Sequence, residues 1–305
     1  MRAVLEIGGT HVTAALVDPL RTRVSRRVRR PLDAWGNAEH ILGTVVRCAG
    51  ELQVPAGQVW GAAVPGPFDH EKGIARFKGV GKFEDLYGID VRSVLIDGVR
   101  PRPADVVFLN DAHAFTLGEW CAGAAAGHRR CVGITLGSGV GSAFLADGVV
   151  RRAGPGVPPE GRVDLLRWSG APLEHSVSRR AILARYGSRR GSRHGGHDVD
   201  VRDIAVRARE GEKWAGQVLD EALAALGTVI APYVRDFGAS AVVVGGAMAL
   251  SWDLVGPAIG AGLGDTPVRP RPGTLGADAA LIGAAVYVDA DGRRAVRRSP
   301  GRGHT

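Results

Sequence analysis

A Gly-Gly pair near the start of the chain has the composition of a phosphate-binding turn. Gly8 and Gly9 join two apolar runs rich in β-branched residues, which predicts a β-hairpin. Glycine has no β-carbon, so its backbone can reach positive φ and approach a ligand closely. In this interpretation the amides of Gly8, Gly9 and Thr10 form a concave nest for an anion. A plain hairpin without a ligand remains the alternative.

Similar turns recur later in the chain, and the recurrence favours a nucleotide as the ligand. A second glycine-linked hairpin is predicted at residues 134–141, with strands at 131–136 and 142–145. A third Gly-Gly pair, Gly245-Gly246, follows a predicted strand at 241–244. Facing turns of this kind could hold the phosphates of a nucleotide from both sides of a cleft.

A carboxylate follows another predicted strand. Residues 105–109 are predicted as a strand that leads directly into Asn110-Asp111, and residues 112–121 have helical composition. An aspartate in this position is a common N-cap of the following helix. The carboxyl ends of strands in open α/β sheets are also where catalytic groups are presented. Both interpretations stay open at this point.

The basic charge does not by itself indicate a nucleic-acid partner. The net charge is +8, and only four of the 39 basic residues are lysines, which leaves 39 − 4 = 35 arginines. Compositional bias in the coding sequence explains such an excess as well as a binding surface does. Arginines cluster at residues 21–30, 179–193 and 293–302, but no DNA-binding module accompanies them. We therefore expect solvated arginines and no nucleic-acid partner.

Length and cysteine content narrow the class of protein. The 305 residues are enough for two domains, and a charged fraction of 23% is typical of a soluble globular protein. No run is long enough to span a bilayer, so we predict a cytoplasmic protein without a membrane partner. Cys48, Cys121 and Cys131 have no paired spacing, which predicts buried thiols and neither a zinc knuckle nor a disulfide framework.

Alternating strands and helices predict an α/β protein with mixed sheets flanked by helices. A small domain is expected at residues 1–111, completed by a helix at about 276–290, and a larger one at 112–275. Residues 188–196 are the best candidate for a mobile loop that leaves the domain. The chain is basic from Asp289 onward, and a disordered tail is expected at 291–305. The further predicted elements are helices at 38–52, 91–96, 173–186, 201–209, 212–237, 253–263 and 278–288, and a strand at 59–64.

In order and spacing, these motifs resemble those of the ROK family of bacterial sugar kinases and repressors. The resemblance covers Val4 to about Tyr287 and implies the actin-like (ribonuclease H-like) two-domain ATPase fold, with a central cleft. It rests on seven segments: residues 6–10, 64–67, Asn110-Asp111, 136–141, Leu173-Glu174, 244–246 and 276–283.

The resemblance assigns roles to individual residues. Asp111 matches the general base that takes a proton from the primary hydroxyl of the sugar. The positions implied to bind the sugar are Pro65, Gly66, Gly79, Asn110, Asp111, Glu160 and Glu174. Those implied to bind ATP are Glu6, Gly8, Gly9, Thr10, His11, Thr135, Gly137, Ser138, Gly139, Gly245, Gly246 and Ala247. The expected cofactors are ATP and Mg²⁺, and the expected assembly is a homodimer.

Three departures from the family pattern bear on function. Glu6 stands where most of the family has Asp, so the arrangement of Mg²⁺ and its waters must shift. The Glu-x-Gly-His sugar motif is degraded to Pro159-Glu-Gly-Arg162, with Arg in place of His. The cysteine-rich zinc element is missing between Val163 and Pro172, so no structural zinc is expected. His194 and His197 are expected to be solvated.

We therefore expect an ATP-dependent kinase acting on the primary (6-) hydroxyl of a hexose or amino-hexose. Kanosamine is the predicted substrate, glucose is the plainer candidate, and a seven-carbon cyclitol of the valiolone type is the alternative. The family also contains sugar-sensing repressors, which carry a helix-turn-helix ahead of the phosphate loop. Here the loop begins at Glu6, which disfavours a repressor, while Glu6 and Arg162 leave a catalytically inactive sensor open.

Overall fold

The computed structural model describes residues 1–188 and 199–298, which form two compact units. The first unit contains Met1–Cys121 and the C-terminal segment from Ala277, and the second contains Ala122–Gly276. The division thus falls after the helix that begins at Asp111, ten residues beyond the predicted boundary. The cause is that this helix packs against the C-terminal helix of its own unit.

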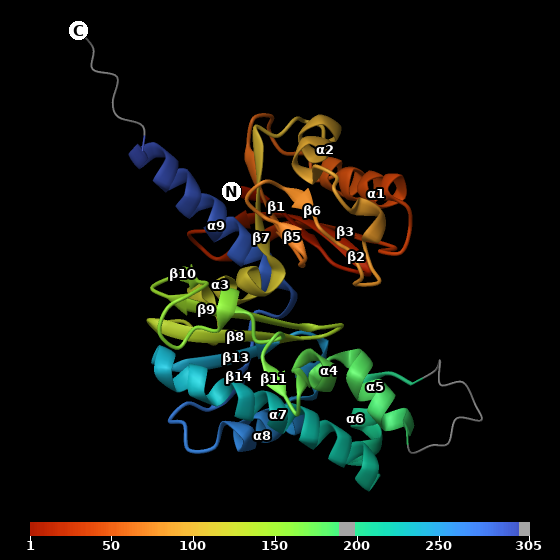
Figure 1. Ribbon diagram of the computed structural model, residues 1–305. Helices are drawn as coiled ribbons and strands as arrows, with labels where there is room; N and C mark the ends of the chain where they lie inside the picture. Colours follow the sequence, from red (N-terminus) through yellow and green to blue (C-terminus); the bar gives the residue numbers. More distant parts are fainter. Residues whose placement is uncertain (189–198, 299–305) are drawn as a thin grey trace. The chain divides into compact units, whose positions relative to one another are not determined.

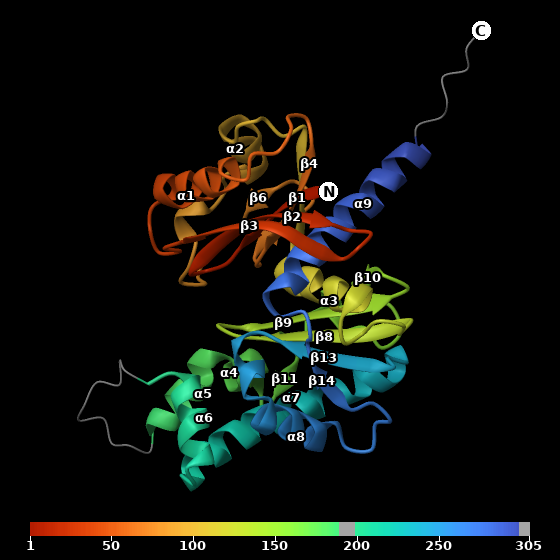
Figure 2. The ribbon, with the colours of Figure 1, turned by 180° about the vertical axis from the view of Figure 1, so that it is seen from behind.

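The first unit is a five-stranded mixed sheet in the order β3-β2-β1-β4-β7 (Figure 1). Helices α1 and α2 lie on one face and α9 on the other (Figures 1 and 2). The elements are β1 (Arg2–Ile7), β2 (His11–Asp18), β3 (Arg23–Pro31), α1 (Ala38–Gly50), β4 (Val59–Val64), β5 (Phe68–Asp69), β6 (Ile74–Ala75), η1 (Glu84–Leu86), α2 (Val91–Gly98), β7 (Asp105–Asn110), α3 (Asp111–Ala122), η4 (Gly276–Asp278) and α9 (Ala279–Arg298).

The second unit is also built on a mixed sheet, in the order β10-β9-β8-β13-β14, with helices packed on it (Figure 1). The elements are β8 (Arg130–Leu136), β9 (Val140–Ala146), β10 (Val149–Arg151), η2 (Pro159–Gly161), β11 (Arg167–Trp168), β12 (Ala171–Pro172), α4 (Glu174–Val177), α5 (Arg179–Ser188), α6 (Val201–Arg209), α7 (Lys213–Phe237), β13 (Ala241–Gly245), η3 (Ala247–Ser251), α8 (Trp252–Leu263) and β14 (Pro270–Pro272).

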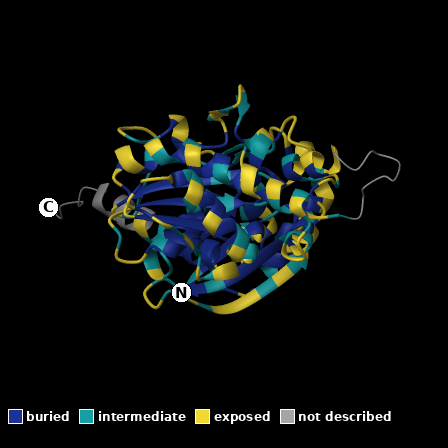
Figure 3. Ribbon diagram, turned by 90° about the horizontal axis from the view of Figure 1, so that it is seen from below, coloured by how far each residue is buried: buried dark blue, intermediate teal, exposed yellow. Residues whose placement is uncertain are grey.

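Each unit has its own apolar core. In the first, alternate residues of β1 and β2 such as Leu5 and Ala14 are buried with Ile41 of α1. In the second, strands β8 and β13 pack with the apolar stripe of α7, which includes Leu226 and Ile230. Buried residues follow the strands and the inner faces of the helices (Figure 3). The alternation along strands and the helical spacing along α7 are the patterns that the sequence shows.

Local signals explain several element boundaries. The Asn37 side chain accepts a hydrogen bond from the His40 N–H and so begins α1, and Gly238 ends α7 in the left-handed region at φ 67°. The helix predicted at 173–186 is in fact two helices, because Ser178 is extended (φ −64°, ψ 156°). Helix α9 continues to Arg298, past residue 291, where the disordered tail was expected to begin. The predicted excursion lies almost wholly outside the described residues.

Candidate active site

The first glycine turn joins β1 and β2. The two strands pair antiparallel up to Ile7 and Val12, and the Gly8 N–H donates a hydrogen bond to the His11 carbonyl at 2.9 Å. Contrary to the possibility raised by the sequence, neither Gly8 nor Gly9 lies in the left-handed region. A β-carbon on Gly9 would meet a single neighbouring atom within 4 Å, the Cδ of Lys82 at 3.7 Å. The turn is therefore open on the Gly9 side, as an anion-binding turn requires.

Thr10 and His11 complete this turn. The Thr10 hydroxyl lies 3.1 Å from Nδ1 of His11. Burial, assisted by the charge of Arg29, lowers the pKa of the His11 imidazole. The ring is consequently held neutral at neutral pH, so His11 can contact a phosphate only through a polarised N–H or the backbone.

Asn110 and Asp111 stand where β7 becomes α3. Strands β4 and β7 are parallel neighbours with Val64 opposite Asn110, so residues 65–66 and 110–111 leave the sheet at the same edge. The Ala112 N–H lies 3.0 Å from Oδ1 of Asn110 and 2.9 Å from Oδ1 of Asp111. The Asp111 N–H also contributes a hydrogen bond to its own carboxylate. The helix cap is therefore shared with Asn110, and the Asp111 carboxylate keeps acceptor capacity for a hydroxyl, because an ionised carboxylate has about four lone-pair sites.

The electrostatics of Asp111 suit a proton acceptor. Burial raises the pKa of this carboxyl, and the Ala112 N–H, Lys82 and His70 oppose the rise. His70 is fixed beside the same strand end by a 3.0 Å contact between its Nε2 and the Val64 carbonyl. A carboxylate with a raised pKa is a stronger base than an exposed one, which is the property that a general base needs.

Glu6 lies within electrostatic range of Asp111. Burial and the charge of Asp111 raise the pKa of Glu6 to about 7, while Arg29 and Arg27 act in the opposite direction. Strand β1 is next to β4, which separates it from β7, so the sheet brings the two carboxyls to one edge. Two carboxyls beside a glycine turn form an acidic pair that a divalent cation would stabilise.

Helix α3 is held by α9 through two glycines. A β-carbon on Gly118 would lie 2.0 Å from the Ala279 carbonyl oxygen, and one on Gly283 would lie 1.9 Å from the Ala114 carbonyl oxygen. The two helices therefore cross in backbone contact, which only glycine permits. Because Asp111 is the first residue of α3, this crossing sets the position of the carboxylate.

The second and third glycine turns lie together in the second unit. Strands β8 and β13 are parallel, with Thr135 opposite Gly245. Gly246 has φ 86°, and a β-carbon there would lie 2.3 Å from the Leu136 carbonyl oxygen. The structure thus brings together the residues predicted to bind nucleotide in this unit, which are Thr135, Gly137, Ser138, Gly139, Gly245, Gly246 and Ala247.

Glu174 lies against the second glycine turn. It is the first residue of α4, and its Oε1 would be 2.3 Å from a β-carbon on Gly139. Glycine at position 139 therefore makes room for the Glu174 carboxylate. The hydrogen bond to Asp164 raises the pKa of the Arg162 guanidinium, and the nearby charges of Glu160 and Glu174 act in the same direction.

Arg162 itself binds Asp164. Its Nε and Nη2 donate to the two carboxylate oxygens at 3.2 and 2.5 Å, and Asp164 is only 8% exposed. Glu160 adopts the left-handed region at φ 57° within η2. The guanidinium is thus neutralised by Asp164, and within residues 1–188 and 199–298 neither Glu160 nor Glu174 forms an ion pair of this kind.

The structure adds residues that the sequence analysis did not assign to the site. They are Lys82, His70 and Arg29, which act on Asp111, Glu6 or His11 through their charges. A sequence signal existed for Lys82, since three of the four lysines lie within residues 72–82.

Two of the glycines predicted to bind the sugar have open surroundings. Gly79 has φ 70°, and a β-carbon built on Gly79 or on Gly66 would meet nothing within 4 Å.

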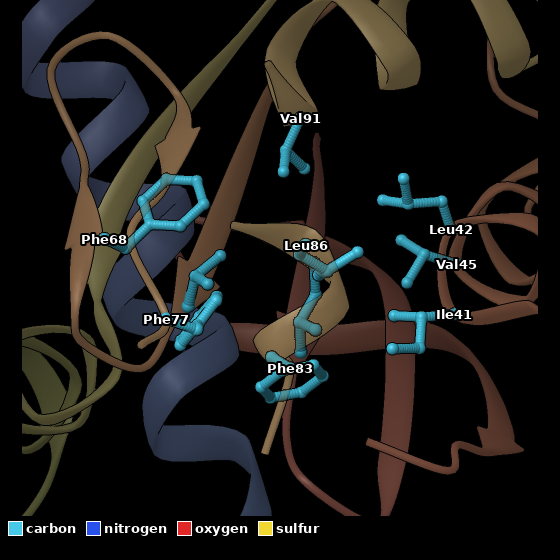
Figure 4. A pocket seen from close by; sticks show the side chains of 10 residues that line it. Ile41, Leu42, Val45, Phe68, Phe77, Phe83, Leu86 and Val91 are labelled. Carbon is cyan, nitrogen blue, oxygen red and sulfur yellow. The ribbon is translucent and has the colours of Figure 1, made fainter. Parts of the chain in front are cut away.

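Two further features do not form ligand sites. An apolar cavity of about 10 Å³ lies beneath the first sheet, lined by core side chains of α1 and of residues 77–91 such as Phe77 and Phe83 (Figure 4). It has room for about one water and offers that water no polar partner.

Among the described residues no group of three or more His, Cys, Asp or Glu side chains is arranged to hold a metal. His175 is exposed, and His194 and His197 lie outside the described residues.

Comparison with known proteins agrees with this arrangement. A profile of the ROK family matches residues 2–291. The glucokinase of Thermotoga maritima is 26% identical over 273 residues, which cover 82% of this chain and 83% of that enzyme. The N-acetyl-D-glucosamine kinase of Mannheimia succiniciproducens is 27% identical over 196 residues, covering 61% of this chain and 62% of that enzyme.

Among solved structures, a ROK family glucokinase from Streptomyces griseus in complex with glucose and AMPPNP superposes with a TM-score of 0.74. The sequences are 24% identical, and the match covers 95% of this chain and 99% of the other. The predicted α/β fold of the actin-like ATPases is confirmed. The chain belongs to the ROK family, and within it to the ATP-dependent carbohydrate kinases.

No helix within residues 1–188 and 199–298 combines the length and the apolar character needed to cross a membrane.

Proposed function

We propose that this protein transfers the γ-phosphoryl group of ATP to the primary (6-) hydroxyl of a hexose or amino-hexose, with Asp111 as general base. The observation that carries the proposal is the position of Asp111. Its carboxyl has a raised pKa, stands at the N-terminus of α3, and lies at the sheet edge to which β1 leads into the first glycine turn. The domain division at Cys121 and Ala277 keeps all of these groups in one unit.

The proposed reaction needs orientation more than covalent catalysis. The hydroxyl of the sugar donates a hydrogen bond to Oδ2 of Asp111, which orients its oxygen toward the γ-phosphorus. As the new O–P bond forms, the bond from the γ-phosphorus to the bridging oxygen breaks, and ADP leaves with that electron pair. The hydroxyl proton passes to Asp111 late in the transfer.

Glycine-rich backbone is proposed to hold the nucleotide in both units. In the first unit Gly8, Gly9, Thr10 and His11 bind phosphate oxygens through N–H groups. In the second unit the binding residues are Thr135, Gly137, Ser138, Gly139, Gly245, Gly246 and Ala247. Such turns bind phosphate because several amide dipoles converge on one anion.

Glu6 fits a role in holding Mg²⁺. Its oxygens are the hard ligands that Mg²⁺ prefers, and the ion in kinases is usually held by one or two carboxylates and the phosphates. When bound, Mg²⁺ neutralises charge that develops on the phosphates. A carboxyl whose pKa is about 7 is only partly ionised at neutral pH, and a nearby cation favours its charged form.

The sugar is proposed to bind through acceptor groups. Asn110, Pro65, Gly66 and Gly79 supply the first unit's contacts, and Glu160 and Glu174 supply those of the second. Because Arg162 is already bound by Asp164, an ammonium on the sugar ring would meet the carboxylates more fully than a hydroxyl does. This favours an amino-hexose such as kanosamine.

Glucose is the second candidate, since glucokinases are among the similar proteins. A valiolone-type cyclitol and a sugar-sensing role follow in that order. Use of ATP is the ground for proposing a cytoplasmic location, and the expected homodimer stays a prediction.

A coupled assay of ADP release with a panel of acceptors tests the function. Kanosamine, glucose, N-acetyl-D-glucosamine, N-acetylmannosamine and valiolone are compared by kcat/KM, because discrimination between substrates lies in that ratio. We expect kanosamine to have the highest ratio. A clear preference for glucose would identify a plain glucokinase, and no turnover with any acceptor would favour the sensor.

A further inference from the structure

Lys82 is close to the first glycine turn and within electrostatic range of the proposed base. Its Cδ is the single neighbouring atom within 4 Å of a β-carbon built on Gly9, at 3.7 Å. Its charge also acts on the Asp111 carboxyl and lowers the pKa that burial has raised. The side chain is therefore in contact range of the turn and within electrostatic range of Asp111. All three residues belong to the first unit.

The backbone on both sides of Lys82 is fixed. Phe83 is 1% exposed, its ring centroid lies 5.1 Å from that of Phe77, and its N–H donates to the Ala34 carbonyl at 2.6 Å. On the other side, the Gly81 N–H donates to Oε1 of Glu84 at 2.8 Å. These contacts hold the Cα of Lys82 in place and restrict where its four-carbon stem can reach.

The Lys82 ammonium has capacity for a ligand. Within residues 1–188 and 199–298 it forms no hydrogen bond and no ion pair, although the side chain is half-buried. An ammonium has three N–H donors, and partial burial without a partner is unfavourable for it. An anion beside Gly9 would satisfy both its charge and its donors.

We propose that the Lys82 ammonium binds the phosphoryl group that is being transferred, first at the γ position of ATP and then on the sugar phosphate. This inference rests on the proposed kinase function and assigns to that site a cation outside the family motifs quoted above. During transfer negative charge is spread over the three equatorial oxygens of the phosphoryl group, and a positioned cation stabilises it. Lys82 keeps its proton throughout, while the hydroxyl proton goes to Asp111.

The choice of lysine fits this role. In a chain with 35 arginines, lysine at a half-buried position is unexpected on composition alone. A compact ammonium on a flexible stem can follow the phosphoryl group from donor to acceptor, whereas a planar guanidinium holds a fixed fork geometry.

The test compares Lys82→Met with Lys78→Met. Lys78 lies four residues earlier in the same loop, and its ammonium is 5.8 Å from the centroid of the Tyr87 ring, so it controls for loss of a loop cation. Binding of ADP and of a non-hydrolysable ATP analogue is measured by calorimetry, alongside kcat with the best sugar. We expect K82M to bind the analogue about tenfold or more weakly, to bind ADP as before, and to lose ~10²-fold in kcat. K78M should resemble the wild type.

A structural role is separated from the proposed one by two further results. The thermal midpoint of K82M should match that of the wild type, and Lys82→Arg should recover part of the analogue affinity because it restores the charge. If K82M fails to fold, Lys82→Gln and K82R are compared in the same way. An unchanged ratio of analogue to ADP affinity together with wild-type kcat would overturn the inference. If the wild type phosphorylates no acceptor, the proposed function fails, while the affinity ratio still decides the role of Lys82.

Discussion

Glu6 and Asp111 are electrostatically coupled: the charge of Asp111 helps burial to raise the pKa of Glu6 to about 7. Glu6 is the last residue but one of β1, Asp111 directly follows β7, and β4 separates these two strands in the sheet. A longer side chain at position 6 than the family's usual aspartate extends the carboxyl further from the strand. The raised pKa of Glu6 should therefore make the stability of the protein depend on pH.

The stability of the protein should fall as pH rises through the titration of Glu6. The folded-state pKa of about 7 lies above the usual value of 4.5, so between these values the folded state binds more protons than the unfolded state. The free energy of unfolding then decreases with pH across that window. One pKa unit corresponds to about 1.4 kcal/mol, so the loss is on the order of 3 kcal/mol.

The comparison of Glu6→Gln with the wild type checks this prediction. Thermal midpoints are measured at pH 5 and pH 8. The wild type should melt lower at pH 8, and the variant should lose most of that difference. Glu39→Gln on the exposed face of α1 serves as control and should keep the wild-type dependence. Equal pH dependence in E6Q and the wild type would contradict the raised pKa.

Asp111→Asn should abolish most of the turnover while leaving nucleotide affinity almost unchanged. The amide keeps the shape of the side chain but cannot accept the hydroxyl proton, so we expect kcat to fall ~10²–10⁴-fold. Steady-state kinetics and ATP binding are measured together. Asp90→Asn is the matched control, because Asp90 caps α2 through the Ser93 N–H at 3.0 Å in the same unit. A D111N variant with wild-type kcat would reduce Asp111 to a helix cap.

Gly139→Ala should displace Glu174 without unfolding the protein. The added methyl group would lie 2.3 Å from Oε1 of Glu174, which is the end of a flexible side chain and can move away. Loss of a charged hydrogen bond to the sugar predicts about a tenfold increase in the KM for sugar. In the Glu174→Ala background the same glycine substitution should add little further, because the two changes remove one interaction. Additive effects in this cycle would disprove the coupling.

Gly118→Ala and Gly283→Ala should each destabilise the protein. Both methyl groups would collide with backbone carbonyl oxygens of the opposite helix, at 2.0 and 1.9 Å, so α3 and α9 must separate. Overpacking of this kind costs about 1–3 kcal/mol. Gly216→Ala is the control, since a β-carbon there meets nothing within 4 Å and helix propensity favours alanine by about 1 kcal/mol. Chemical denaturation measures all three, and a stable G283A would refute the close crossing.

Much of the fold could be predicted because the patterns are local. The Gly-linked hairpins of β1–β2 and β8–β9, the buried strands β4 and β13 and the apolar stripe of α7 each follow from residue periodicity. The break at Ser178 could not, because nothing in the composition of residues 173–186 signals an extended residue there. The continuation of α9 to Arg298 was also missed, since a basic segment with glycine is read as disordered when its neighbours are unknown.

The candidate site was predictable where short motifs carry it and unpredictable where distant residues meet. Asn110-Asp111 and the glycine turns could be found by position after a strand. The contact of Gly139 with Glu174 and the pairing of Arg162 with Asp164 depend on packing that the sequence does not show. Lys82 approaches Gly9 across more than seventy residues, so only the clustering of lysines in an arginine-rich chain hinted at it.

The crossing of α3 and α9 also bears on how the protein is synthesised. The ribosome completes Asp111 long before it reaches Gly283, and the whole second unit is translated in between. Until α9 emerges, α3 lacks the neighbour that fixes its position, and the nascent chain exposes the β1 and β4 surface that α9 covers. The proposed site is therefore completed only after α9 has been translated, and a chain truncated before residue 279 would contain every proposed catalytic residue without the helix that positions them.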